Sequence, residues 1–144
     1  MKVMLIEDNP TMLEMMNSLI QFLQFECTKF MDPIKAVEEY SKQEFDLVIT
    51  DYQMPGLNGI EVINKILEIN PAADVIIMSG TEDIEVRAKE AGAAHVFKKP
   101  PDFNRLINTI KSYAKKKNVE GKRTVVPKNI LAPSYQKQSS VTEG

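Results

Sequence analysis

Five short apolar segments that alternate with amphipathic segments constrain the fold of this chain more than any other feature. Each has the length of a β-strand, and they span residues 3–6, 27–30, 46–50, 74–79 and 95–97. After the first, third and fifth strands, apolar residues recur every three or four positions, which is typical of the buried face of a helix, whereas the segment after the fourth is only weakly amphipathic. Strands that alternate with helices indicate βαβ units with right-handed crossovers, which put helices on both faces of a parallel sheet. The sequence therefore predicts an α/β fold with a doubly wound parallel sheet of five strands.

Local signals mark several helix ends. Asp32 followed by Pro33 is a typical helix start, and Asn58 with Glu61 three residues later predicts a capping box. Gly92 is placed to end the helix before the last strand. The helices are predicted over about residues 12–23, 33–41, 60–67, 81–91 and 102–116.

The charge of the chain is divided unevenly. Residues 1–114 hold 18 acidic and 11 basic side chains, whereas residues 115–144 hold 2 acidic and 7 basic ones, which leaves a net charge of −2. The C-terminal part has scattered prolines, glycines and polar residues without a sustained period. We therefore predict a domain over residues 1–116 and a disordered basic linker or C-terminal extension over residues 117–144. The extension could contact nucleic acid or an anionic surface, but its composition favours a solvated linker.

Cysteine content and hydropathy bear on the compartment. Cys27 is the one cysteine, so no disulfide can form within the chain. No apolar run approaches the ~20 residues that a membrane span needs, and the N-terminus lacks the pattern of a signal peptide. We expect a cytoplasmic protein that does not bind membranes.

Polar side chains lie where the predicted strands end. They follow the first, third and fifth strands and end the fourth, and they are Glu7, Asp8, Asp51, Ser79, Lys98 and Lys99. Because the carboxyl ends of parallel strands meet at one edge of a sheet, where ligands bind in such folds, we expect these groups to converge.

The chemistry of this set suits phosphoryl transfer. Clustered carboxylates repel one another, and a hard divalent cation such as Mg²⁺, which prefers oxygen ligands, would compensate them. A lysine and a serine would supply a charge and a donor to an anion with several oxygens. The aspartate would act as a nucleophile that becomes an acyl phosphate.

Each residue also has an ordinary explanation. An acid after a strand often caps a helix, Glu7 to Pro10 has the composition of a turn, and exposed lysines are usually solvated. The coincidence of the whole set at one predicted edge favours the phosphoryl-transfer interpretation. His95, the only histidine, receives no catalytic role.

Four segments together resemble the receiver domains of two-component response regulators: "LIEDNP", "DLVITDYQMPGLNG", "IIMSG" and "AGAAHVFKKP". The resemblance covers residues 1 to about 115. It implies the flavodoxin-like strand order 2-1-3-4-5 with five helices.

The resemblance implies roles for the polar set. Asp51 would be the phosphoacceptor, and Mg²⁺ (or Mn²⁺) would be held by Asp8, by Asp51, by the backbone carbonyl of Gln53 and, through water, by Glu7. Ser79 and Lys99, rather than Lys98, would bind the phosphoryl group. The Lys99–Pro100 bond would be cis, and Pro55, Gly56 and Gly59 would shape the acceptor loop.

One position departs from the family pattern. Three residues before the lysine the family usually has an aromatic residue that couples to the hydroxyl residue, but this chain has Val96. A β-branched side chain cannot swing in the same way, and Phe97 should face the opposite side of the sheet. Gln53 and Thr81 fall at positions that tune the phosphoryl lifetime in the family.

The expected function is a phosphoacceptor rather than an enzyme. A sensor histidine kinase or a histidine phosphotransfer protein would phosphorylate Asp51. Phosphorylation would then switch a surface formed by the fourth helix, the fifth strand and the fifth helix. The resemblance also implies that a homodimer could form through this surface. Nucleic acid would be a partner only if an output domain follows. The alternatives are an interaction module that works without phosphorylation and a Mg²⁺-dependent aspartyl phosphatase, against which Gln53 counts because that enzyme needs a second acid there.

Overall fold

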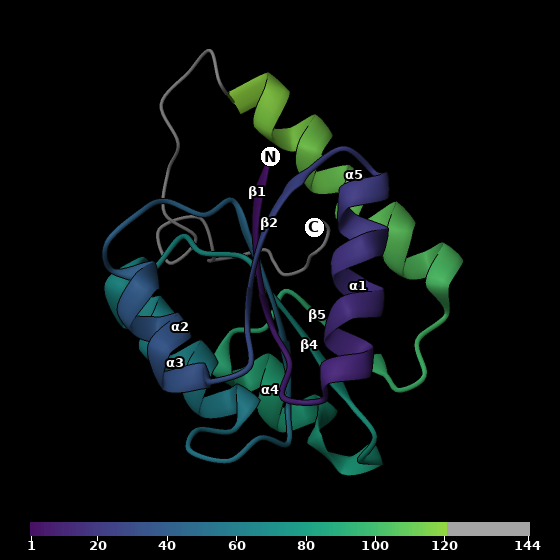
Figure 1. Ribbon diagram of the computed structural model, residues 1–144. Coiled ribbons are helices and arrows are strands. Elements are labelled where there is room, and N and C mark those ends of the chain that lie inside the picture. Colours follow the sequence, from purple (N-terminus) through teal and green to yellow (C-terminus); the bar gives the residue numbers. More distant parts are fainter. Residues whose placement is uncertain (121–144) are drawn as a thin grey trace.

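Five parallel strands form one sheet at the centre of the domain (Figure 1). The computed structural model describes residues 1–120, without the side chains of residues 82 and 118–120. The strands are β1 (Lys2–Ile6), β2 (Glu26–Phe30), β3 (Leu47–Asp51), β4 (Val75–Ser79) and β5 (His95–Lys98). Their order is β2-β1-β3-β4-β5, and all neighbours are parallel, as predicted.

Helices cover both faces of the sheet. They are α1 (Pro10–Phe22), α2 (Pro33–Tyr40), α3 (Gly59–Ile69), α4 (Glu85–Ala91) and α5 (Phe103–Glu120). One face packs against α1 and α5, and the other packs against α2, α3 and α4. Within residues 1–120, none of the helices has the length and hydropathy to cross a membrane.

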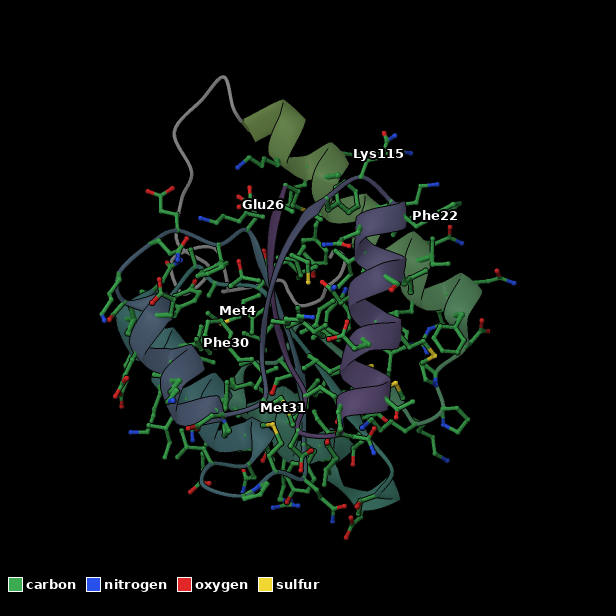
Figure 2. All side chains as sticks on the ribbon, in the orientation of Figure 1. Met4, Phe22, Glu26, Phe30, Met31 and Lys115 are labelled. Atoms are coloured by element: carbon green, nitrogen blue, oxygen red, sulfur yellow. The ribbon has the colours of Figure 1, made fainter. Side chains whose placement is uncertain are left out.

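Strand residues alternate between two apolar clusters, one on each face. Met4 and Ile6 lie in the cluster under α2, α3 and α4, whereas Val3 and Leu5 lie in the cluster under α1 and α5. Burial of both faces explains why the strand segments are continuously apolar. Figure 2 shows Met4 in the interior and Phe22, which is 81% exposed, at the outer edge of α1.

The predicted helix caps are present. The side chain of Asp32 accepts a hydrogen bond from the backbone N–H of Ile34, and Asn58 and Glu61 form a complete capping box. Gly92 ends α4 with a positive φ of 113°, a conformation that glycine adopts without steric cost.

The predicted fourth and fifth helices differ most from the structure. Residues 81–91 do not form one α-helix, because residues 82–84 form a 3₁₀ turn before α4 and Thr81 makes no side-chain cap. The last helix extends to Glu120 rather than ending at 116, and Lys117 of its final turns contacts Asp46 at 2.7 Å. The predicted disordered extension therefore overlaps α5 at residues 117–120, and its remaining residues lie outside the described part of the chain.

Candidate functional site

Three carboxylates meet at the carboxyl edge of the sheet. Asp51 ends β3, while Glu7 and Asp8 directly follow β1, the strand that pairs with β3 through Ile6 and Thr50. One oxygen from each carboxylate lies within 4.8 Å of the other two. The structure thus shows the convergence that the parallel sheet predicts.

Lys99 joins two of these acids. Its Nζ atom lies 2.9 Å from Oε1 of Glu7 and 2.9 Å from Oδ1 of Asp51. The backbone N–H of Lys99 donates to the carbonyl of Ser79 at 2.8 Å, which fixes the residue beyond the end of β5. Lys98 is exposed, and the Lys99–Pro100 peptide bond is cis, as the resemblance implies.

The electrostatics of the cluster are dominated by burial. Glu7 is fully buried and Asp51 is 5% exposed, so desolvation raises the pKa of both carboxyl groups, although hydrogen bonds from Lys99 act in the opposite direction. Burial alone would lower the pKa of Lys99, but its hydrogen bonds to Glu7 and Asp51 outweigh burial and raise it. Burial thus disfavours the charged forms of two carboxyl groups, and the Lys99 ammonium group favours them.

The donor set fits a hard divalent cation. All the candidate side-chain ligands are carboxylate oxygens, the ligand type that Mg²⁺ prefers. Both oxygens of Glu7 already have protein partners, since Oε1 accepts from Lys99 and Oε2 accepts from the backbone N–H of Asn9 at 3.1 Å. Asp8 is half-buried and faces a more open environment. This difference suits direct coordination by Asp8 and an indirect contribution from Glu7.

Ser79 lies beside the acids with its hydroxyl group engaged by Thr81. The buried hydroxyl accepts from the backbone N–H of Thr81 at 2.9 Å and donates to the carbonyl of the same residue at 3.2 Å. Ser79 ends β4, whose neighbouring residue Met78 pairs with Asp51 in β3. Ser79 therefore ends its strand at the same edge of the sheet as Asp51.

The loop after Asp51 packs very closely onto α3. The backbone N–H of Gly59 donates to the carbonyl of Tyr52 at 2.7 Å. A Cβ atom at Gly59 would lie 2.5 Å from the carbonyl oxygen of Asp51 and 2.7 Å from Cδ1 of Ile77. Only glycine fits this approach, and Gly56 in the same loop has a φ of 93°. Gln53 is exposed in this loop, and metal binding by its carbonyl stays a prediction.

Sequence reasoning did not find four interactions near the site. Asn9 holds Glu7 through its backbone N–H, and its side chain caps α1 by accepting from the N–H of Met12 at 3.0 Å. The Asn9–Pro10 pair carried the same cap signal as Asp32–Pro33. The Ser79–Thr81 bonds and a hydrogen bond between Tyr52 and Arg87 had no signal in the sequence.

Val96 and Phe97 face opposite sides of the sheet, as predicted. Val96 packs against the cluster under α2, α3 and α4, whereas Phe97 is buried in the cluster under α1 and α5. Phe97 therefore does not replace an aromatic side chain at position 96.

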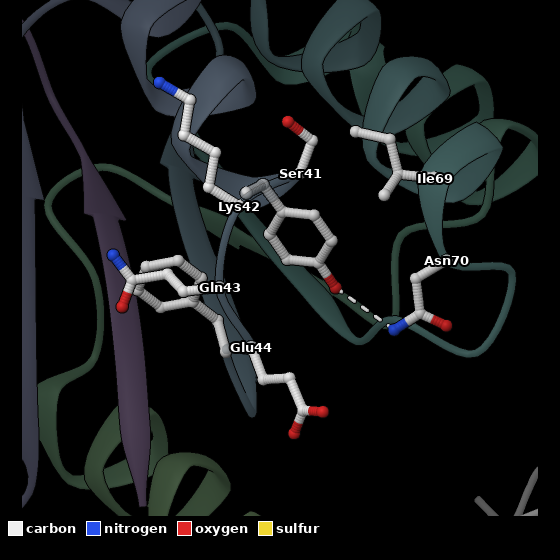
Figure 3. A pocket seen from close by; sticks show the side chains of 8 residues that line it. Ser41, Lys42, Gln43, Glu44, Ile69 and Asn70 are labelled. Carbon is white, nitrogen blue, oxygen red and sulfur yellow. Dashed lines mark hydrogen bonds between the residues drawn. The ribbon is translucent and has the colours of Figure 1, made fainter.

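A cavity of about 410 Å³ lies at the opposite edge of the sheet, before β3 (Figure 3). The Tyr40 hydroxyl in this cavity accepts a hydrogen bond from Nδ2 of Asn70 at 3.2 Å, and the Tyr40 ring stacks on Phe45. This cavity shares no lining residue with the acidic cluster, so it has no part in that site.

Comparison with known proteins identifies the family. The model of the response regulator receiver domain matches residues 3–111. A cyclic di-GMP phosphodiesterase from Thermotoga maritima is 33% identical over 108 residues, which cover 74% of this chain but 29% of the relative. The chemotaxis protein CheY from the same organism is 29% identical, over 79% of this chain and 98% of the relative. The chain thus spans under a third of the first relative and nearly all of the second.

Solved structures agree with this assignment. A response regulator receiver domain protein from Clostridium thermocellum superposes with a TM-score of 0.75 at 26% identity, over 82% of this chain and 97% of that one. A response regulator from Thermotoga maritima, solved in complex with Mg²⁺ and BeF, gives a TM-score of 0.72 at 23% identity, over 78% and 97% of the two chains. The second likeness shows the fold alone.

Proposed function

The chain belongs to the family of response regulator receiver domains, and from this premise we propose that it accepts a phosphoryl group on Asp51. The observation that carries the proposal is the position of Asp51 within 4.8 Å of two further carboxylates and 2.9 Å from the Lys99 ammonium group. A buried acid beside two further carboxylates needs a compensating cation, and the same cation would neutralise charge on a transferring phosphoryl group.

The proposed step is an in-line displacement at phosphorus. A carboxylate oxygen of Asp51 attacks the phosphorus of a phosphohistidine, a P–O bond forms, and the P–N bond to the imidazole breaks. The imidazole leaves with the electron pair of that bond and takes up a proton. The product is an acyl phosphate on Asp51, and attack by water at phosphorus later returns the carboxylate.

Asp8, Asp51 and the carbonyl of Gln53 would hold Mg²⁺ or Mn²⁺, with Glu7 acting through water. When bound, such a cation neutralises charge on the transferring phosphoryl oxygens. The hydrogen bond from Asn9 keeps Glu7 in place on one side, and Gly59 keeps the backbone of Asp51 in place on the other.

Lys99 and Ser79 would bind the phosphoryl group after transfer. The phosphoryl group carries about −1.5 to −2 charges at neutral pH, in place of the single negative charge of the free carboxylate. Lys99 already contacts Asp51, so it would follow the new charge, and the Ser79 hydroxyl would leave Thr81 to donate to a phosphoryl oxygen. These shifts would bias the surface formed by α4, β5 and α5, which we also propose as the surface of a homodimer.

Receiver domains receive phosphoryl groups from histidine kinases or phosphotransfer proteins, and we propose such a donor here, in the cytoplasm. The domain then acts as a phosphoacceptor and not as an enzyme with a separate substrate. The chain spans 29% of the length of one relative and 98% of another, so the proposal concerns the receiver domain and not the activity of a whole protein. Nucleic acid would be a binding partner only through an output domain.

The test is phosphoryl uptake from a small phosphodonor with Mg²⁺, measured as the intact mass of the chain. We expect wild type to gain one phosphoryl group, Asp51→Asn to gain none, and the control Asp83→Asn, an exposed acid outside the cluster, to behave as wild type. Equal uptake by Asp51→Asn would show that another residue is the acceptor.

A further inference from the structure

We propose that Tyr52 and Arg87 form a tether that passes the state of the phosphoacceptor loop to α4. Nη2 of Arg87 donates a hydrogen bond to the Tyr52 hydroxyl at 3.0 Å, and the guanidinium carbon lies 5.7 Å from the centre of the Tyr52 ring. Tyr52 directly follows Asp51, and Arg87 lies at an exposed position of α4. The inference rests on the proposed function, because it concerns how phosphorylation of Asp51 reaches this helix.

The backbone of Tyr52 is held at the site itself. Its N–H donates to the carbonyl of Met78 at 2.8 Å, and its carbonyl accepts from the N–H of Gly59 at 2.7 Å. These bonds connect Tyr52 to β4 and to the start of α3, so its position depends on the backbone around Asp51. A change in the acceptor loop therefore changes where the Tyr52 hydroxyl meets Arg87.

The start of the α4 region has a second connection to the site. Thr81 exchanges two hydrogen bonds with the Ser79 hydroxyl and directly precedes the 3₁₀ turn that leads into α4. Under the proposed function this hydroxyl turns to the phosphoryl group, which breaks both bonds to Thr81. The hydrogen bond from Arg87 to Tyr52 is a connection between the acceptor loop and the helix that does not pass through Ser79.

The helix is weakly anchored in other respects. It has seven residues and no side-chain hydrogen bond at its N-cap. Ile84 and Ala88 are buried against the domain, whereas Val86 is 67% exposed. A segment with few buried apolar contacts opens at low free-energy cost, so one polar contact has a measurable effect on it. The usual net strength of a hydrogen bond corresponds to a change of roughly threefold to tenfold in an opening equilibrium.

Val96 lacks the aromatic ring that couples this position to the hydroxyl residue in the family, which favours a connection from another part of the site. It packs on the same face of the sheet as Ile84 and Ala88, and its β-branched side chain has one strongly restricted χ1 angle. A side chain that keeps its rotamer cannot pass a change at Ser79 to the helix by swinging. The tether reaches the same helix from the β3–α3 loop instead.

The experiment compares hydrogen exchange of the α4 amides in the full chain for wild type, Tyr52→Phe, Arg87→Met and the double variant. Tyr52→Phe removes only the hydroxyl and keeps the ring, so the fold is preserved. We expect each single variant to exchange roughly threefold to tenfold faster in α4, and the double variant to match the single ones, because both substitutions remove the same contact. Additive effects, or no effect, would overturn the tether.

The same measurement after treatment with a small phosphodonor and Mg²⁺ separates signalling from structure. We expect phosphorylation to speed α4 exchange in wild type, and to speed it several-fold less in both single variants. An unreduced response in the variants would mean that the contact is only structural, which contradicts the proposal.

Two controls and one parallel readout complete the design. Arg105→Met removes another arginine that lies over an aromatic ring, 4.3 Å from the centre of Phe97, and Lys89→Met removes a positive charge from α4 itself. Both should leave α4 exchange as in wild type. The intact mass of the same samples reports phosphoryl uptake. If wild type takes up no phosphoryl group, the proposed function is contradicted and the signalling role of the tether falls with it. If uptake occurs but α4 exchange in the variants responds to phosphorylation as in wild type, the tether alone is contradicted.

Discussion

Nζ of Lys99 lies 2.9 Å from Oδ1 of Asp51, although β4 separates β3, which ends in Asp51, from β5, which directly precedes Lys99. The lysine reaches across the end of β4 because Lys99 and Pro100 extend beyond β5 over the carboxyl edge of the sheet. The contact joins the buried carboxyl group of Asp51 to the Lys99 ammonium group, which would stay beside Asp51 after phosphorylation.

Lys99→Met should lower the free energy of unfolding by roughly 2–4 kcal/mol in Mg²⁺-free buffer, since it leaves Glu7 and Asp51 buried without their partner. The measurement is urea unfolding followed by circular dichroism. The matched control is Lys98→Met, which removes the same charge from the adjacent exposed position and should cost about 1 kcal/mol or less. Equal losses for the two variants would contradict the assignment of Lys99.

Mg²⁺ should stabilise the domain through the acidic cluster. At a concentration ten times the dissociation constant, binding to the folded state alone adds about 1.4 kcal/mol, which a thermal shift assay detects. Asp8→Asn should remove most of this gain, whereas Glu90→Gln, an exposed acid of α4, should retain it. A full Mg²⁺ response in Asp8→Asn would exclude Asp8 as a direct ligand.

Asp51→Asn should stabilise the metal-free domain at neutral pH. Burial raises the pKa of Asp51, and that of Glu7 beside it, so the folded state binds protons more tightly than the unfolded state. The sign follows from this: the stabilising effect of the proton is present at acidic pH and is lost as pH rises through the raised folded-state pKa.

The advantage of Asp51→Asn over wild type should therefore grow from about pH 4 toward neutral pH, measured by unfolding in EDTA. Glu68→Gln, which removes an exposed acid from α3, should show no such trend. An advantage that shrank with rising pH would mean that Lys99 outweighs burial at Asp51.

Gly59→Ala should lower the free energy of unfolding by roughly 1–3 kcal/mol, because the new methyl group would lie 2.5 Å from the carbonyl oxygen of Asp51 and 2.9 Å from Cα of Tyr52. Backbone atoms cannot move aside as a flexible side chain can, so phosphoryl uptake should slow as well. Gly80→Ala is the control, since nothing lies within 4 Å of its new methyl group, and its stability should stay within about 0.5 kcal/mol of wild type. Chemical unfolding and intact-mass kinetics measure both effects.

The fold was largely predictable because its signals are local or repeat along the chain. Strands buried on both faces leave continuous apolar runs, and helix caps such as Asn58 with Glu61 are complete within four residues. The prediction failed where local pattern and backbone geometry diverged. Residues 82–84 form a 3₁₀ turn directly after Thr81, whose backbone is bound to the Ser79 hydroxyl, and apolar periodicity does not register such a contact.

The sequence by itself determined which groups stand at the ends of the strands, since a parallel sheet brings Glu7, Asp8, Asp51 and Ser79 to one edge whatever the details of packing. The tertiary structure alone decided which atoms meet there. In the folded protein one oxygen of Glu7 accepts a hydrogen bond from Lys99 and the other accepts from Asn9. Tyr52 and Arg87, which are 35 positions apart in the chain, are hydrogen-bonded. Contacts of this kind depend on strand register, loop path and side-chain reach, which no spacing of residues along the chain encodes.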